Sequence, residues 1–145
     1  MIDERFMRLA IEKAKQGIRN GQEPFGACVV KAGKVISCAH NTILKTLDVT
    51  AHAEINAIRE ACQALNSLDL SGCVVYATHE PCDMCRNVCE RVNIAKIVYG
   101  GSNGIGRSTE CSIAQMEIVS DFLREDTMKL LTLWATWKTK NTESQ

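Results

Sequence analysis

An amphipathic pattern near the beginning of the chain predicts a helix. Asp3 is a suitable N-cap residue, and a largely apolar stripe follows it at helical spacing. The members of this stripe are Phe6, Leu9, Ala10, Lys13 and Ala14. We expect Gly17 and residues 21–24 to end the helix. Two short apolar runs, 27–30 and 35–39, then flank a turn and predict a β-hairpin.

The remainder of the chain alternates between helix-like and strand-like patterns. After a polar loop over residues 40–50, apolar residues at i, i+3, i+4 spacing predict a helix from Ala51. Strands are predicted at 73–77, 95–99 and 116–119, with a helix starting at Pro81 between the first two. A glycine-rich loop is expected at 102–106. The final helix carries Leu123, Leu130, Leu131, Trp134 and Trp137.

This order of elements predicts the architecture. Strands that alternate with helices pair in parallel and carry helices on both faces of the sheet, and the first hairpin makes the sheet mixed. The sequence contains no repeat or linker, so we expect one domain over residues 1–145. Ligand sites in such sheets lie outside the carboxyl ends of the strands, where helices begin.

The composition of the chain limits which partners it is expected to bind and in which cellular compartment it is expected. The chain has 17 basic and 17 acidic residues, and this balance disfavours extensive binding to nucleic-acid phosphates. No run approaches the ~20 apolar residues of a membrane span, and the charged N-terminus lacks a secretory signal, so we expect a cytoplasmic protein without a membrane partner. In a reducing compartment, clustered cysteines are typical metal ligands, whereas scattered cysteines are typical core thiols. We assign the second role to Cys28, Cys38, Cys62 and Cys73.

Two short motifs suggest metal chemistry. Cys82 and Cys85 are separated by two residues at a predicted helix start, a spacing that fits a redox pair or half of a structural zinc site equally well. His52 supplies a third ligand, which leaves a fourth tetrahedral position for water. Glu54 is the candidate for moving protons. Residues at i and i+2 do not share a helix face, so the spacing alone leaves open a role for Glu54 at the helix dipole.

These motifs resemble a known signature. His52-Ala53-Glu54 followed by Pro81-Cys82-Asp83-Met84-Cys85 is similar to the H-x-E…P-C-x-x-C pattern of the cytidine deaminase-like superfamily. The resemblance extends over nearly the whole chain and includes Pro24-Phe25-Gly26-Ala27 and Asn41. Within the superfamily it is nearest to guanine deaminases, yeast-type cytosine deaminase and tRNA adenosine deaminases.

The resemblance implies a fold and a mechanism. The fold is an α/β, three-layer α-β-α sandwich with a five-stranded mixed sheet, usually in a homodimer. Zn²⁺ is the cofactor, His52, Cys82 and Cys85 are its ligands, and Glu54 shuttles protons during hydrolytic removal of an amino group. Asn41, the Ala53 N–H and Phe25 would contact the base. By residue type alone, Asn41 is equally a turn residue and Phe25 a core aromatic.

Three other residues have competing interpretations. Cys89 could add a third thiolate, which would close the zinc shell and give a non-catalytic, zinc-stabilised interaction domain; that would leave the His-Ala-Glu spacing without a purpose. His79 follows a strand, where burial is at least as expected as catalysis, so it is not placed in the catalytic set. Trp137 is expected in core or dimer packing, with covering of the pocket as the alternative.

Substrate signals in the sequence conflict. Residues 24–27 resemble guanine deaminases, whereas 116–131 resemble tRNA deaminases. The intervening segment lacks both the Lys-Thr-Gly run of the tRNA enzymes and the Phe-Asp-Asp run of the guanine enzymes, although Glu110 could replace the latter's carboxylate. Because basic residues are few near the C-terminus, we expect a free nucleobase such as guanine or cytosine, or a small nucleoside-like analogue. The alternative is tRNA adenosine-to-inosine deamination.

Overall fold

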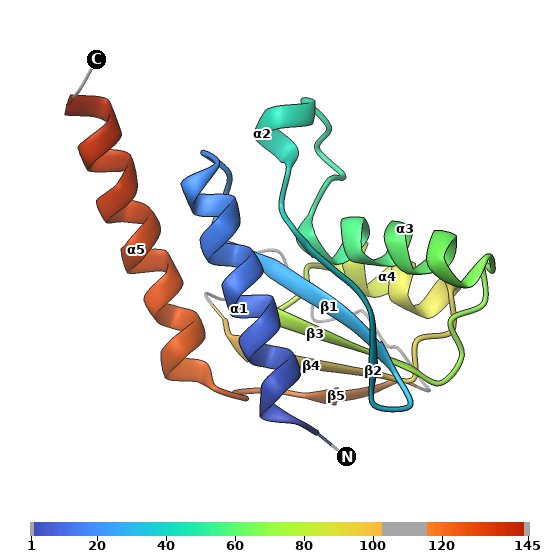
Figure 1. Ribbon diagram of the computed structural model, residues 1–145. Helices are drawn as coiled ribbons and strands as arrows, with labels where there is room; N and C mark the ends of the chain where they lie inside the picture. Colours follow the sequence, from blue (N-terminus) through green and yellow to red (C-terminus); the bar gives the residue numbers. More distant parts are fainter. Residues whose placement is uncertain (1, 103–115, 144–145) are drawn as a thin grey trace.

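The computed structural model describes residues 2–102 and 116–143, and a mixed sheet lies at its centre (Figure 1). Two sequence predictions lie outside the described residues. They are the part of the glycine-rich loop that follows Ser102, and the carboxylate of Glu110. The elements in chain order are α1 (Glu4–Arg19), β1 (Gly26–Lys31), β2 (Lys34–His40), α2 (Ile43–Thr46), α3 (Ala53–Leu65), β3 (Cys73–His79), α4 (Asp83–Arg91), β4 (Lys96–Gly101), β5 (Glu117–Val119) and α5 (Arg124–Glu143).

The five strands follow the order β2-β1-β3-β4-β5. β1 pairs antiparallel with β2 and β3, whereas β3–β4 and β4–β5 are parallel. The register places Gly26 opposite His40, Ala27 opposite Ala77, and His79 opposite Gly101. The carboxyl ends of β2, β3 and β4 therefore share one edge with the amino end of β1, and the candidate residues gather at this edge.

Helices cover both faces of the sheet, which confirms the predicted three-layer sandwich (Figure 1). Alternation along β3 shows how the strands feed two cores. Tyr76 joins a cluster with α1 and α5, whereas Val75 and Ala77 join a cluster with α3 and α4. Gly26 allows α1 to pack closely, since a Cβ at this position would collide with the Ala10 carbonyl oxygen.

The first helix begins as predicted but presents a different face. The Asp3 carboxylate accepts a hydrogen bond from the Arg5 N–H, as an N-cap should. Leu9 is 43% exposed, and Lys13 is only half-buried, because the buried stripe centres one residue away from the predicted one. Its members are Phe6, Met7, Ala10, Ile11, Ala14, Gly17 and Ile18. The helix continues through Gly17 to Arg19, and the His40 ring packs against Gly17 where a side chain would otherwise lie.

The hairpin confirms its prediction, but two of its cysteines differ from expectation. Cys28 and Cys38 are direct partners in the β1–β2 register and form a disulfide. Their assignment as separate reduced core thiols was therefore wrong, because cross-strand partners bring two side chains together in a way that spacing along the chain does not reveal. Cys62 and Cys73 are free thiols, half-buried and buried respectively.

The remaining helices and strands begin or end within a few residues of their predicted boundaries. The expected polar loop contains the short helix α2, and Pro81 precedes the N-cap of α4 rather than opening the helix. Trp137 packs against the α1/α5 cluster, on the sheet face opposite α3 and α4, so it does not cover the candidate metal site. Within the described ranges, no helix combines the length and apolar character needed to cross a bilayer.

Candidate metal and catalytic site

His52 is placed by the start of α3. It is the N-cap residue, with extended backbone angles of φ −65° and ψ 157°, and its side chain makes no capping hydrogen bond. The preceding loop is held by Asn56, whose amide nitrogen donates to the His40 and Ala51 carbonyls and to the Thr42 hydroxyl. Sequence reasoning missed Asn56, because an asparagine inside a helix carries no distinctive signal. This anchoring fixes the direction in which the imidazole leaves the backbone.

The two cysteines are placed by the start of α4. Cys82 is the N-cap residue in extended conformation, again without a side-chain cap, and Cys85 lies in the first helical turn. Cys82 is half-buried and Cys85 is fully buried. Because α3 and α4 begin at the same edge of the sheet, their first turns bring the imidazole and both sulfurs together.

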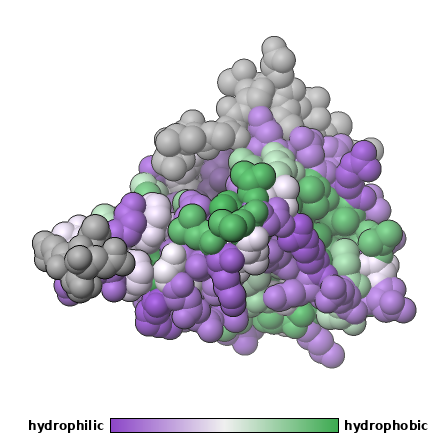
Figure 2. All heavy atoms as spheres, turned by 90° about the horizontal axis from the view of Figure 1, so that it is seen from above, coloured by the Kyte–Doolittle hydropathy of each residue, from purple (hydrophilic) through white to green (hydrophobic). Residues whose placement is uncertain are grey.

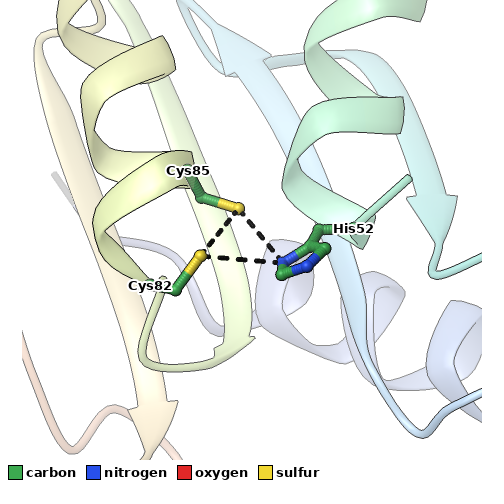
Figure 3. Close-up of side chains that lie close together, drawn as sticks. All are labelled: His52, Cys82 and Cys85. Atoms are coloured by element: carbon green, nitrogen blue, oxygen red, sulfur yellow. Dashed lines mark hydrogen bonds between the residues drawn. The ribbon is translucent and has the colours of Figure 1, made fainter. Parts of the chain in front are cut away.

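The three side chains converge on one point (Figure 3). The Cys82 and Cys85 sulfurs are 3.7 Å apart, and the His52 Nδ1 lies 3.7 Å from the first and 3.5 Å from the second. Tetrahedral zinc with Zn–S of ~2.3 Å and Zn–N of ~2.0–2.1 Å requires separations of about 3.8 Å between sulfurs and about 3.6 Å between sulfur and nitrogen. The observed triangle therefore fits zinc without rearrangement.

The electrostatics of the triangle favour a thiolate. A hydrogen bond shared with Cys85 lowers the pKa of the Cys82 thiol to about 4, and the His52 imidazole acts in the same direction. The same hydrogen bond and burial raise the pKa of the Cys85 thiol. A metal ion would take the place of the thiol proton in the hydrogen bond between Cys85 and Cys82. The sulfurs would then hold the ion at a helix N-terminus, where negative charge is stabilised.

Glu54 lies beside the triangle. Its side chain is 6% exposed, and its carboxyl group interacts with the Cys85 thiol and the His52 imidazole. Burial raises the pKa of this carboxyl. Because His52 lies outside the helix as its cap, the rule that i and i+2 residues point apart does not apply, and Glu54 can approach the same point. The arrangement places a proton acceptor next to a three-ligand metal site.

The three candidate base-contacting residues lie at the same sheet edge. Asn41 is 2% exposed; its Oδ1 accepts a hydrogen bond from the Ile43 N–H, and its backbone N–H donates to the Phe25 carbonyl. Ala53 is the first residue of α3, where backbone N–H groups have no partner within the helix. The Phe25 ring packs edge-on against His79, with centroids 5.1 Å apart. Asn41 thus is a turn residue, and its base-contacting role stays a prediction.

Two residues that competed for roles in the metal site lie outside the group of side chains able to hold a metal. Within residues 2–102 and 116–143, the group able to hold a metal consists of His52, Cys82 and Cys85 alone. Cys89 is fully buried in the α3/α4 core, where burial raises the pKa of its thiol to about 12. His79 is buried at the end of β3, and desolvation lowers the pKa of its imidazole to about 4. Among the described residues, the geometry therefore gives no support to Cys89 as a third sulfur ligand.

Comparison with known proteins defines the class. Residues 1–101 match the family described as the cytidine and deoxycytidylate deaminase zinc-binding region. The chain belongs to this family of zinc-binding deaminases, whose homologues are hydrolytic enzymes acting on C–N bonds. His52, Cys82 and Cys85 form its candidate metal site.

Individual relatives point to two substrate classes. The tRNA-specific adenosine deaminase of Aquifex aeolicus is 44% identical over 96 residues, which is 66% of this chain and 64% of that protein. The guanine deaminase of Bacillus subtilis is 42% identical over 86 residues, 59% of this chain and 55% of that protein. A structure from a study of A-to-I editing by tRNA:A34 deaminases superposes with a TM-score of 0.82 at 31% identity, covering 88% of this chain and 99% of that one.

Proposed function

We propose that this protein deaminates adenosine to inosine in a tRNA loop and releases ammonia. The observation that carries the proposal is the extent of the sequence likeness to tRNA deaminases. The match to the tRNA-specific adenosine deaminase of B. subtilis covers 86% of this chain, so it must continue beyond the zinc-binding region at 1–101, whereas the match to the guanine deaminase of the same organism covers 59%. The comparisons therefore support the tRNA alternative better than the free base expected from the sequence.

Local charge supports an RNA substrate despite the balanced total. Arg19 ends α1, Lys45 lies on α2, and Lys138 and Lys140 lie near the end of α5. All four are exposed, and these parts of the three helices lie towards the same end of the molecule (Figure 1). Net charge sums both signs over the whole surface, so it does not test whether one end can contact several phosphates.

The residues of the site divide the chemistry among them. Zinc, when bound by His52, Cys82 and Cys85, supplies Lewis acidity that lowers the pKa of water to ~7. The Glu54 carboxylate accepts a proton from the attacking water and returns it to the exocyclic amine, which leaves as ammonia. Asn41 and the Ala53 N–H orient the base by hydrogen bonds, and Phe25 packs against it.

Deamination of a free purine such as guanine is the second candidate. The match to B. subtilis guanine deaminase favours it, as do residues 24–27, which resemble the guanine enzymes. This candidate uses the same metal site and the same glutamate. It differs only in what surrounds the base.

A substrate screen separates the two. Ammonia release would be measured with guanine, cytosine, adenine, their nucleosides and an anticodon stem–loop containing adenosine at the wobble position. Inosine would be read in the RNA by nuclease digestion and mass spectrometry. We expect conversion of the RNA alone, at a rate that falls by ~10²–10⁴ in Glu54→Gln. Guanine turnover without inosine in the RNA would replace our proposal with the second candidate.

The homodimer stays a prediction. Leu44, Leu47 and Val49 are 54%, 91% and 76% exposed on α2 and the segment after it. Figure 2 views this end of the molecule and shows apolar side chains gathered within a mostly polar surface. Exposed apolar groups of this kind favour protein contact. Analytical ultracentrifugation of the wild type and of Leu47→Ser would test whether a second copy covers them.

A further inference from the structure

A buried ion pair lies directly beneath the loop that carries Cys82. Arg86 and Glu80 have side chains that are 3% and 10% exposed, and the Arg86 guanidinium donates to the Glu80 Oε2 at 3.0 Å. The other oxygen, Glu80 Oε1, accepts a hydrogen bond from the Ser102 hydroxyl. The Glu80 N–H donates to the Gly101 carbonyl at 2.9 Å. The network thus joins α4 to the loop before it and to the end of β4.

Arg86 contacts each of the three residues that lead into the helix. Besides the carboxylate of Glu80, its Nε donates to the Pro81 carbonyl at 3.3 Å, and its backbone N–H donates to the Cys82 carbonyl at 3.0 Å. A planar guanidinium can make the two side-chain bonds at once, which a lysine ammonium on a flexible stem does less well. The loop is therefore fixed to the second turn of α4 by one side chain.

The two sulfur ligands depend on this loop to different degrees. Cys85 lies inside the helix, so the helical backbone determines where its sulfur lies. Cys82 is the N-cap residue in extended conformation and lacks a side-chain cap bond, so its sulfur follows the backbone of residues 80–82. Replacing the Arg86 side chain would remove the two bonds that hold Glu80 and Pro81, while the backbone bonds and the helix that carries Cys85 would remain.

We propose that Arg86 is a positioning residue for the metal site, holding the Cys82 sulfur in place through Pro81 and Glu80. A buried ion pair is weak evidence for a stabilising role, because apolar residues of the same volume often stabilise a fold equally well. Groups that orient metal ligands, by contrast, commonly change metal affinity when replaced. This inference rests on the metal site of the proposed function and is independent of its substrate.

The test measures metal binding in the full-length protein. Zinc affinity would be determined by competition with a chromophoric chelator, and the geometry of the site by the visible absorption bands of the cobalt(II)-substituted protein. Arg86→Lys retains the charge and loses the planar fork. The double variant Glu80→Gln with Arg86→Met removes both charges, so neither is left buried and unpaired if a single variant fails to fold. Arg91→Ala is the control, an exposed arginine in the last turn of the same helix.

We expect both Arg86 variants to bind zinc about 10- to 100-fold more weakly. Their cobalt bands should shift, while Arg91→Ala should match the wild type in affinity and spectrum. A folded double variant with wild-type zinc affinity and an unchanged cobalt spectrum would overturn the proposal, even if its melting temperature fell. Wild-type protein without stoichiometric zinc would instead refute the metal site on which the proposed function depends.

Discussion

Helix α1 and helices α3 and α4 begin with the same backbone conformation but use it differently. Asp3 caps α1, and its carboxylate accepts a hydrogen bond from the helix that it precedes. His52 and Cys82 occupy the equivalent position in α3 and α4, yet neither side chain makes a capping bond. An N-cap residue lies outside the helical spiral, so its side chain can turn towards a neighbouring helix. The site therefore replaces two caps, each worth ~1 kcal/mol, with two metal ligands.

Replacing His52 with Ser would give α3 the kind of start that α1 has. Zinc should fall from about one per chain to nearly none, since two sulfurs remain, and turnover should be lost. Metal analysis after dialysis measures the first effect. Measured in chelator, unfolding by urea should show this variant ~1 kcal/mol more stable than His52→Ala, because serine restores a cap. Full zinc retention would remove His52 from the ligand set.

Glu54→Gln tests the residue that follows the cap. The variant should retain zinc and the fold, while the deamination rate falls by ~10²–10⁴, because the amide cannot accept and return a proton. Single-turnover kinetics on the converted substrate, together with metal analysis, separate chemistry from metal loss. A variant that turns over at nearly the wild-type rate would show that another group moves the proton.

Asn41→Asp tests base recognition at the end of β2. The new carboxylate can still accept from the Ile43 N–H but has lost the amide donor, so kcat/KM should fall by about tenfold while zinc content stays unchanged. Comparing kcat/KM with zinc content shows whether Asn41 binds the base or maintains the metal site. Equal loss of both quantities would assign it to maintaining the site.

Asp3→Ala has the smallest expected effect. Loss of the cap should reduce the free energy of unfolding by ~1 kcal/mol, and the zinc content and rate should match the wild type. Urea unfolding with metal analysis measures both quantities. If this variant lost zinc, the start of α1 would be coupled to the site, and the contrast between the helix starts would fail.

Much of the fold and the candidate ligand set follow from local patterns in the sequence. Apolar periodicity predicts the helices and strands, and the cysteine spacing at a helix start predicts the pairing of two sulfurs. Contacts that depend on the register between strands, or on a side chain at an N-cap position, could not be predicted from the sequence. The Cys28–Cys38 disulfide requires the β1–β2 alignment, and the approach of Glu54 requires His52 to lie outside α3. Arg86 and Glu80 are six residues apart, a spacing that predicts no contact.

The separation of the ligands along the chain has a further consequence. His52 and Cys82 are 30 positions apart in sequence, and the interval between them contains α3 and β3. A bound ion is thus a cross-link that closes a long loop, and it restricts the unfolded chain much as a covalent bridge would. The lifetime of the protein in a cell should therefore rise with zinc supply, because chains that acquire the ion late stay open to proteases for longer.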